Sequence, residues 1–249
     1  MSLFPIEIPI GVAKLPAHLV FETLGYTLGF RYYVYLRKKR GDAISDEHRL
    51  MIFIGAALGG LLGSHLLGFL ESPAYWQDWR FLANKTVVGG LLGGLAGVEW
   101  VKKRLGVTES SGDLMVFPLL LGQILGRVGC LLTGVADGTW GNPSALPWAF
   151  DAGDGVLRHP TPLYEIILLA VLWVGIRSLE RRFTLINGAR FKLYLASYLL
   201  FRLLVETIKP VYLWSHISIS SIQIACLLGL LYYHKVWIKP HHLIDSTTS

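Results

Sequence analysis

Seven apolar segments, of which the third and the last are short, constrain this chain more than any other feature of its sequence. A helix that crosses a membrane needs about 20 mostly apolar residues, and it satisfies its backbone hydrogen bonds internally. The candidate segments are residues 15–36, 50–70, 86–101, 114–133, 161–178, 190–208 and 219–235. We predict an all-α, polytopic membrane bundle of about seven transmembrane helices, with residues 1–249 forming a single integral membrane domain.

The balance of charged and apolar residues supports this class. Charged residues make up 16% of the chain, against about 25% in soluble domains, and the mean hydropathy is +0.48. The net charge of +6 does not indicate a nucleic-acid partner, because the lysines and arginines cluster between the apolar segments. Two cysteines, Cys130 and Cys226, lie in or at the edge of apolar segments, which argues against a disulfide framework.

The basic clusters predict an orientation. They follow the first, third, fifth and seventh segments, at residues 37–40, 102–104, 177–182 and 234–239. Basic connections stay in the cytoplasm, so we expect the N-terminus outside and the C-terminus in the cytoplasm. The longest polar insertion, residues 134–160, is then an external loop or small domain between the fourth and fifth spans.

Glycines recur every four residues in the second and third segments. They are Gly55, Gly59 and Gly63 in the second and Gly89, Gly93 and Gly97 in the third. Small residues at this spacing let two helix backbones approach closely in lipid, so we expect tight helix packing. A glycine-lined seat for a lipid headgroup is the alternative.

Two arginines lie deep inside predicted spans. Arg127 and Arg202 each lie about six residues from the outer end of their segment, roughly 9 Å below the surface at 1.5 Å per residue. A charge at the bilayer centre costs about 2.5–3.5 kcal/mol, so such residues usually face the bundle interior and have a function. Tyr198, Arg202 and Glu206 are spaced four apart and form one polar stripe.

Two guanidinium groups need more than the single carboxylate of Glu206. In one interpretation Glu22 supplies the second carboxylate, and a buried ion-pair network holds the bundle together. In the other, the remaining positive charge binds a phosphate or phosphodiester, for which the planar fork of arginine is suited. The residues by themselves therefore indicate an outward-facing, arginine-lined phospholipid site.

Four short motifs carry a resemblance to a known family. They are Gly-Arg-Val-Gly at 126–129, Leu-Pro-Trp at 146–148, Arg-His-Pro-Thr-Pro-Leu-Tyr-Glu at 158–165, and the Tyr, Phe-Arg and Val-Glu positions of 198–206. In this order and spacing they resemble the motifs of the prolipoprotein diacylglyceryl transferases, with weaker similarity over nearly the whole chain.

The resemblance implies a seven-helix enzyme of the bacterial inner membrane. Such an enzyme moves the diacylglyceryl group of phosphatidylglycerol onto the lipobox cysteine of a prolipoprotein, and glycerol phosphate leaves. It implies no metal and no organic cofactor. The expected partners are phosphatidylglycerol or another anionic phospholipid, a prolipoprotein and the lipid bilayer.

Eight residues acquire expected roles from the same resemblance. For substrate binding, Arg127 would hold the headgroup phosphate, with Gly126, Gly129 and Tyr164 around it. Catalytic residues would be Arg202, which assists the leaving group, Glu206 and Tyr198, which orient Arg202, and His159, which lines the outer mouth together with Tyr164.

The sequence departs from the family pattern at several positions. The signature asparagines fall on Cys130 and Thr133, and the glutamate falls on Val135. The third-span histidine, the family's proposed base, is replaced by Val88, and a valine accepts no proton. Cys130 is interpreted as a small packing residue rather than as an acyl-transfer nucleophile.

The missing histidine leaves both the base and the acceptor open. A thiol needs a base or a lowered pKa to react well. The candidate bases are first His65, His159 and Asp137, and after them His18 and Lys85. Three functions follow: prolipoprotein diacylglyceryl transfer with a relocated base, transfer of a lipid-phosphate-derived group to another acceptor, or lipid binding without catalysis.

Overall fold

The chain is mostly helical in the computed structural model, which describes residues 4–10, 13–73, 76, 84–214 and 218–244. Eight α-helices occur in the described residues, and the first seven coincide with the seven predicted segments. Their bounds are α1 Ala17–Arg40, α2 Asp46–Leu70, α3 Val87–Leu105, α4 Val116–Thr133, α5 Thr161–Arg182, α6 Ala189–Val205, α7 Ser221–Tyr232 and α8 His234–Ile238.

Two small antiparallel hairpins depart from the all-α prediction. β1 (Glu7–Ile10) pairs with β2 (Ala13–Pro16) just before α1, and β3 (Phe150–Asp151) pairs with β4 (Leu157–Arg158) inside the polar insertion. Strands of two to four residues carry too little alternating pattern to be recognised in a sequence. The hairpins are minor additions to a helical fold.

Three helical stretches in the described residues are long and apolar enough to cross a membrane. They are Asp46–Leu70, Val116–Asp137 and Thr161–Arg182, and a shorter apolar helix covers Ser221–Tyr232. The second of them joins α4 to the 3-10 helix η3 (Gly134–Asp137). The fold is therefore a helical one with membrane-spanning capacity, while the count of seven spans and their orientation stay predictions.

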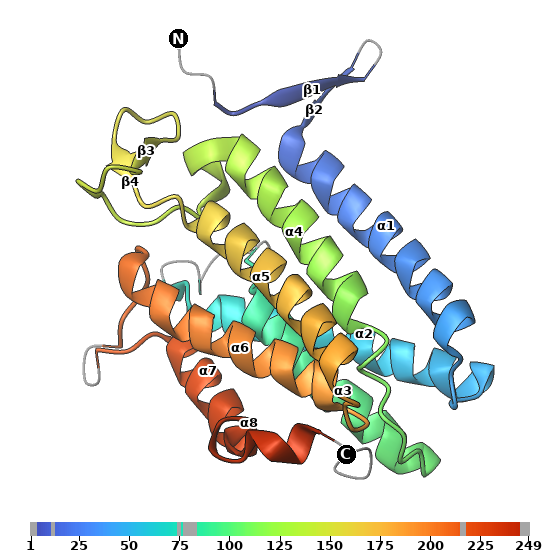
Figure 1. Ribbon diagram of the computed structural model, residues 1–249. Helices are drawn as coiled ribbons and strands as arrows, with labels where there is room; N and C mark the ends of the chain where they lie inside the picture. The colour runs from blue at the N-terminus through green and yellow to red at the C-terminus, as the bar shows by residue number, and fades with distance from the viewer. Residues whose placement is uncertain (1–3, 11–12, 74–75, 77–83, 215–217, 245–249) are drawn as a thin grey trace. The chain divides into compact units, whose positions relative to one another are not determined.

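The chain divides into two compact units, of which the first contains α1, α4 and α5. Figure 1 shows these three helices side by side, with the β1–β2 hairpin at the start of α1. Close backbone approach between α1 and α4 explains a glycine in each helix. A Cβ on Gly25 would lie 2.9 Å from the carbonyl oxygen of Gly122, nearer than a side chain tolerates.

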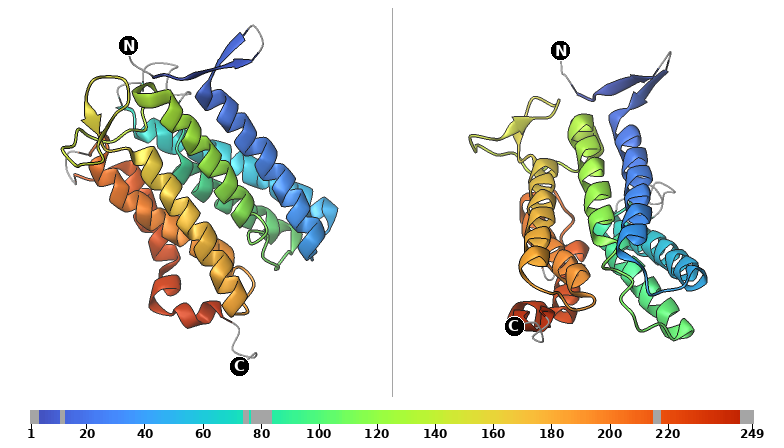
Figure 2. Two further views of the ribbon diagram at one scale, coloured as in Figure 1. Left: turned by 45° about the horizontal axis from the view of Figure 1, so that its top comes forward. Right: turned by 45° about the vertical axis from the view of Figure 1, so that its right-hand side comes forward.

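The second unit contains α2, α3, α6, α7 and α8. Within it α2 packs along α3, and α6 packs against α7 (Figure 2). The glycine stripes of α2 and α3 face one another: a Cβ on Gly63 would lie 2.9 Å from the Cα of Gly93, and one on Gly55 would lie 2.9 Å from the carbonyl oxygen of Gly97. The predicted tight packing is confirmed, and backbone rather than a lipid headgroup occupies this seam.

Helix starts in the second unit follow local capping chemistry. Ser45 and Thr86 accept hydrogen bonds from the backbone N–H groups of His48 and Gly89, at the starts of α2 and α3. Ser220 and Gln223 form a reciprocal capping box at the start of α7. These bonds satisfy N–H groups that have no partner inside the helix, which fixes where each apolar segment begins.

Candidate active site

Arg127, on α4, is paired with a glutamate that the sequence analysis did not assign. Its Nε lies 2.8 Å from Oε1 of Glu165, in the first turns of α5, and the two side chains are 13% and 4% exposed. The interpretation that Glu22 balances this arginine is wrong, because Glu22 lies beside His18 instead. Glu165 was detectable as an acidic residue inside a predicted span.

Arg202, on α6, is paired with Glu206 as the four-residue spacing predicts. Nη2 of Arg202 lies 2.6 Å from Oε2 of Glu206, and both side chains are buried. Glu206 follows α6 directly and opens the 3-10 helix η4 (Glu206–Ile208). Each of the two arginines thus has its own carboxylate, and the second carboxylate that the sequence analysis required is Glu165.

Tyr198, one turn before Arg202 on α6, and Glu71 are further polar residues of the second unit. Tyr198 is fully buried and stacks on Tyr194, with ring centroids 6.3 Å apart. Glu71 follows α2 and accepts a hydrogen bond of 2.9 Å from the backbone N–H of Ile222. Burial raises the pKa of Glu71 and the charge of Glu206 adds to this, while the Ile222 hydrogen bond opposes it. Glu71 was missed because it lies at the boundary of its apolar segment.

His159, Tyr164 and Trp148 lie together in the first unit. Nδ1 of His159 lies 3.3 Å from the hydroxyl of Tyr164, and that hydroxyl accepts a hydrogen bond of 2.7 Å from Nε1 of Trp148. The two rings also meet edge to face at 6.2 Å. Two motifs that the sequence separates, Leu-Pro-Trp and the one containing His159, are therefore parts of one cluster.

The two glycines that flank Arg127 have different surroundings. A Cβ on Gly126 would meet no other atom within 4 Å, so there is open space beside the guanidinium-bearing turn. A Cβ on Gly129 would lie 3.1 Å from the Cα of His18 and from the Cβ of Phe21, on α1. Gly129 therefore lets α1 approach α4, and its expected part in substrate binding stays a prediction.

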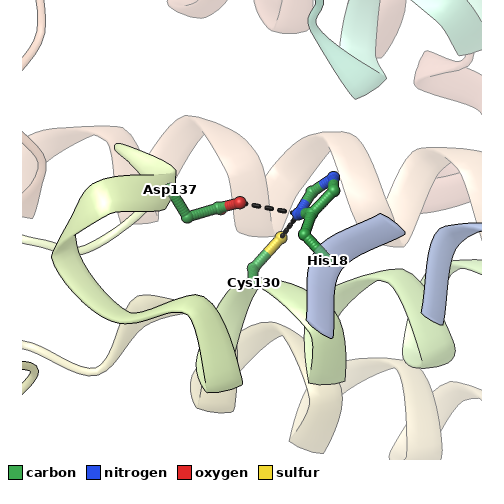
Figure 3. Close-up of side chains that lie close together, drawn as sticks. All are labelled: His18, Cys130 and Asp137. Carbon is green, nitrogen blue, oxygen red and sulfur yellow. Dashed lines mark hydrogen bonds and ion pairs between the residues drawn. The ribbon is translucent and has the colours of Figure 1, made fainter. Parts of the chain in front are cut away.

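One face of the first unit brings together a histidine, an aspartate and a cysteine (Figure 3). Nδ1 of His18 lies 2.6 Å from Oδ1 of Asp137 and 3.8 Å from Sγ of Cys130, and Nη1 of Arg127 donates to the same sulfur over 3.5 Å. Cys130 is buried, which favours the packing interpretation over that of a nucleophile.

The remaining candidate bases have other surroundings. Nδ1 of His65 lies 2.9 Å from the carbonyl oxygen of Leu61, so this histidine is bonded to its own helix. Lys85 is exposed at the residue before the cap of α3. Of the five candidates, only His18 and Asp137 contact each other. The sequence analysis placed Asp137 among the first candidates and His18 after them.

The candidate residues fall in both units. Arg127, His159, Tyr164 and the two glycines belong to the first, whereas Tyr198, Arg202 and Glu206 belong to the second. Convergence of the two arginines on one phosphate stays a prediction. Each arginine is a cation held by a carboxylate, Arg202 buried and Arg127 partly buried, and a cation held in this way can bind an anionic oxygen without reorganising.

Comparison with known proteins covers nearly the whole chain. The family model described as prolipoprotein diacylglyceryl transferase matches residues 5–238. Proteins named phosphatidylglycerol–prolipoprotein diacylglyceryl transferase are similar to it: one from Vibrio vulnificus (strain YJ016) is 32% identical over 225 residues, covering 83% of this chain and 80% of the relative. One from Bordetella parapertussis is 32% identical over 237 residues, with coverage of 83% and 84%, and one from Glaesserella parasuis is 29% identical over 219 residues, with coverage of 82% and 80%.

Proposed function

We infer that this protein is a diacylglyceryl transferase, because the chain belongs to the prolipoprotein diacylglyceryl transferase family. It transfers the diacylglyceryl group of phosphatidylglycerol to the lipobox cysteine of a prolipoprotein, in the maturation of lipoproteins. The observation that carries this function is the match over residues 5–238, which includes every motif quoted above. The acceptor sulfur replaces the phosphate oxygen on the glyceryl carbon, and glycerol phosphate leaves.

The phosphate of the lipid headgroup binds at Arg127. Its guanidinium lies 2.8 Å from Glu165 and donates to Sγ of Cys130 over 3.5 Å, so its orientation is fixed. The open space beside Gly126 is consistent with a headgroup bound at this turn of α4. Gly129 and Tyr164 complete the binding residues, and the hydrogen bond from Trp148 fixes the Tyr164 hydroxyl.

Arg202 stabilises the negative charge that grows on the departing phosphate. Glu206 holds its guanidinium through a buried contact of 2.6 Å, and Tyr198 packs one turn earlier on the same helix. A buried, oriented donor stabilises such charge without reorganising at the moment of reaction. His159, bonded to Tyr164, lines the entrance to the site.

The protein spans the bacterial inner membrane with seven helices, its N-terminus outside and its C-terminus in the cytoplasm. The three helices that meet the length and hydropathy of a span support this, as does the regular alternation of basic connections. Residues 134–160 then lie outside, where a prolipoprotein presents its lipobox. Residues 1–249 act as one integral membrane domain.

The orientation is tested by reporter fusions. A reporter placed after Arg40 or at the C-terminus is expected to read cytoplasmic, and one inserted within 140–155 is expected to read external, because the basic clusters are retained inside. Paired reporters, one active only in the cytoplasm and one only outside, make the measurement at each site. An external reading after Arg40 contradicts the topology.

The reaction is tested by complementation. In a strain depleted of its own diacylglyceryl transferase, expression of this protein is expected to restore growth and to yield prolipoprotein carrying a thioether-linked diacylglyceryl group. Purified protein is expected to release glycerol phosphate from labelled phosphatidylglycerol only when a lipobox peptide is present. An inserted, folded protein that neither complements nor forms the thioether excludes this acceptor.

A further inference from the structure

The proposed function gives no role to the contact between His18 and Asp137 in the first unit. His18 is the second residue of α1, and Asp137 is the last residue of η3, directly beyond α4. They are separated by more than a hundred positions in the sequence, yet Nδ1 of His18 lies 2.6 Å from Oδ1 of Asp137 (Figure 3). The aspartate side chain is 7% exposed and the histidine side chain is 40% exposed, so the pair has a buried end and an open end.

The hydrogen bond to Asp137 fixes which ring nitrogen carries the proton. A carboxylate only accepts hydrogen bonds, so the neutral ring bears its proton on Nδ1 and keeps a lone pair on Nε2. Nε2 lies on the open side, 3.7 Å from Oε2 of Glu22. A ring that takes a proton at Nε2 therefore has carboxylates on both sides, which is the arrangement of a supported general base.

The sulfur of Cys130 connects the His18–Asp137 pair to Arg127, the proposed phosphate-binding residue. Sγ of Cys130 lies 3.8 Å from Nδ1 of His18 and accepts a hydrogen bond of 3.5 Å from Nη1 of Arg127. All of these residues belong to the first unit. A base and a phosphate-binding cation this close can act in the same displacement reaction. The base removes the proton of the nucleophile, and the cation stabilises the negative charge on the departing phosphate.

A metal ion is the alternative occupant of this cluster, since ligand atoms of His18, Cys130 and Asp137 lie within 4.8 Å of one another. The surroundings disfavour it. The Arg127 guanidinium donates to the sulfur, and a divalent cation bound there would be repelled by that charge. Nδ1 of His18 is also engaged by Asp137, so it could bind a metal only if that hydrogen bond were lost.

We propose that His18 is the general base of the transfer and that Asp137 is its positioning residue, an assignment that rests on the proposed function. Nε2 of His18 takes the proton of the lipobox thiol. The thiolate sulfur forms a bond to the glyceryl carbon, the bond from that carbon to the phosphate oxygen breaks, and its electron pair leaves on glycerol phosphate. His18 then releases the proton to water, which restores the neutral ring.

The chemistry requires such a group at neutral pH. A cysteine thiol has a pKa near 8.5, so only a few per cent is ionised at pH 7. A positioned general base contributes about 10²–10⁴-fold to a rate. The charged and titratable groups in contact with His18 in the described residues are Glu22 on its own helix, Asp137 on η3 and Cys130 on α4.

The test compares the wild type with His18→Asn in the assay with phosphatidylglycerol and a lipobox peptide. The asparagine amide still donates to Asp137 but carries no basic nitrogen. The kcat is expected to fall about 10²–10⁴-fold at pH 7. The deficit is expected to shrink about tenfold per pH unit toward pH 8.5, as hydroxide ionises the thiol, and added imidazole is expected to restore part of the rate. Asp137→Asn is expected to lower kcat while leaving the KM for the peptide unchanged.

The control is His234→Asn, at a histidine whose Nδ1 lies 2.8 Å from the carbonyl oxygen of Leu231 and which has no part in the proposed site; it is expected to keep wild-type activity. His18→Gln is measured beside His18→Asn, with thermal unfolding of every variant in detergent. A folded His18 variant with more than a third of wild-type activity overturns the assignment, as does a folded, inactive variant that responds to neither imidazole nor pH. A wild type without turnover overturns the proposed function itself, which is a separate result.

Discussion

Arg202→Lys is expected to lower the turnover of phosphatidylglycerol about 10²–10³-fold in a protein that still folds and inserts. Lysine keeps the positive charge but loses the planar fork that binds two phosphate oxygens at once. Arg202→Ala removes the charge as well, so its activity is expected to be lower still. The measurement is the initial rate of glycerol phosphate release with a lipobox peptide as acceptor.

A second pair of substitutions separates catalysis from structure. Arg202 and Glu206 form a buried ion pair, and such a pair can often be replaced by apolar residues without loss of stability. Arg202→Met combined with Glu206→Met is therefore expected to give a stable but inactive protein. Full activity in this double variant would remove Arg202 from the catalytic residues.

The matched control lies at the start of the same helix. Arg190 pairs with Asp113 over 3.4 Å and is 26% exposed. Arg190→Lys therefore makes the same arginine-to-lysine change in an ion pair outside the proposed site. It is expected to keep activity within about twofold, because lysine keeps the positive charge beside Asp113 and this pair has no role in the proposed site. An equal loss in the Arg190 and Arg202 variants would indicate a general effect on α6.

The helical fold was predictable because its signals are local. The apolar segments are recognisable one by one in the sequence, although the third and the last are short, and the glycines four apart specify which faces of α2 and α3 meet. The β1–β2 and β3–β4 hairpins were not predictable in this way. Their pairing depends on contacts between segments of only two to four residues.

The candidate site shows the same division between local and distant information. The Arg202–Glu206 contact follows from a four-residue spacing on one helix. The Arg127–Glu165 and His18–Asp137 contacts join different helices, so they cannot be predicted from the spacing of residues within one segment. Glu22 was chosen as a partner because it is acidic and inside a span, but Glu165 satisfies the same criterion. Only the packing of α4 against α5 distinguishes the two.

Gly93→Ala is expected to destabilise the second unit by about 3 kcal/mol, whereas Gly90→Ala on the same helix is expected to be tolerated. A Cβ on Gly93 would overlap the carbonyl oxygen of Gly59 and lie 2.9 Å from the Cα of Gly63. Both are backbone atoms, so α2 and α3 have to separate along their whole seam, at the upper end of the about 1–3 kcal/mol that overpacking usually costs.

The Gly90 variant is the matched control for this seam because it adds the same methyl group one turn away on a neighbouring face. Its nearest neighbours, the carbonyl oxygen of Gly60 and the Cβ of Ser64, would lie 3.8 Å away, which is ordinary van der Waals contact. Alanine also favours a helix over glycine by about 0.5–1 kcal/mol, so Gly90→Ala is expected to hold or raise the Tm. The two variants are compared by their Tm in detergent and by the fraction of each protein that is monodisperse. Equal Tm values for the two variants would mean that α2 and α3 do not depend on backbone contact at Gly93.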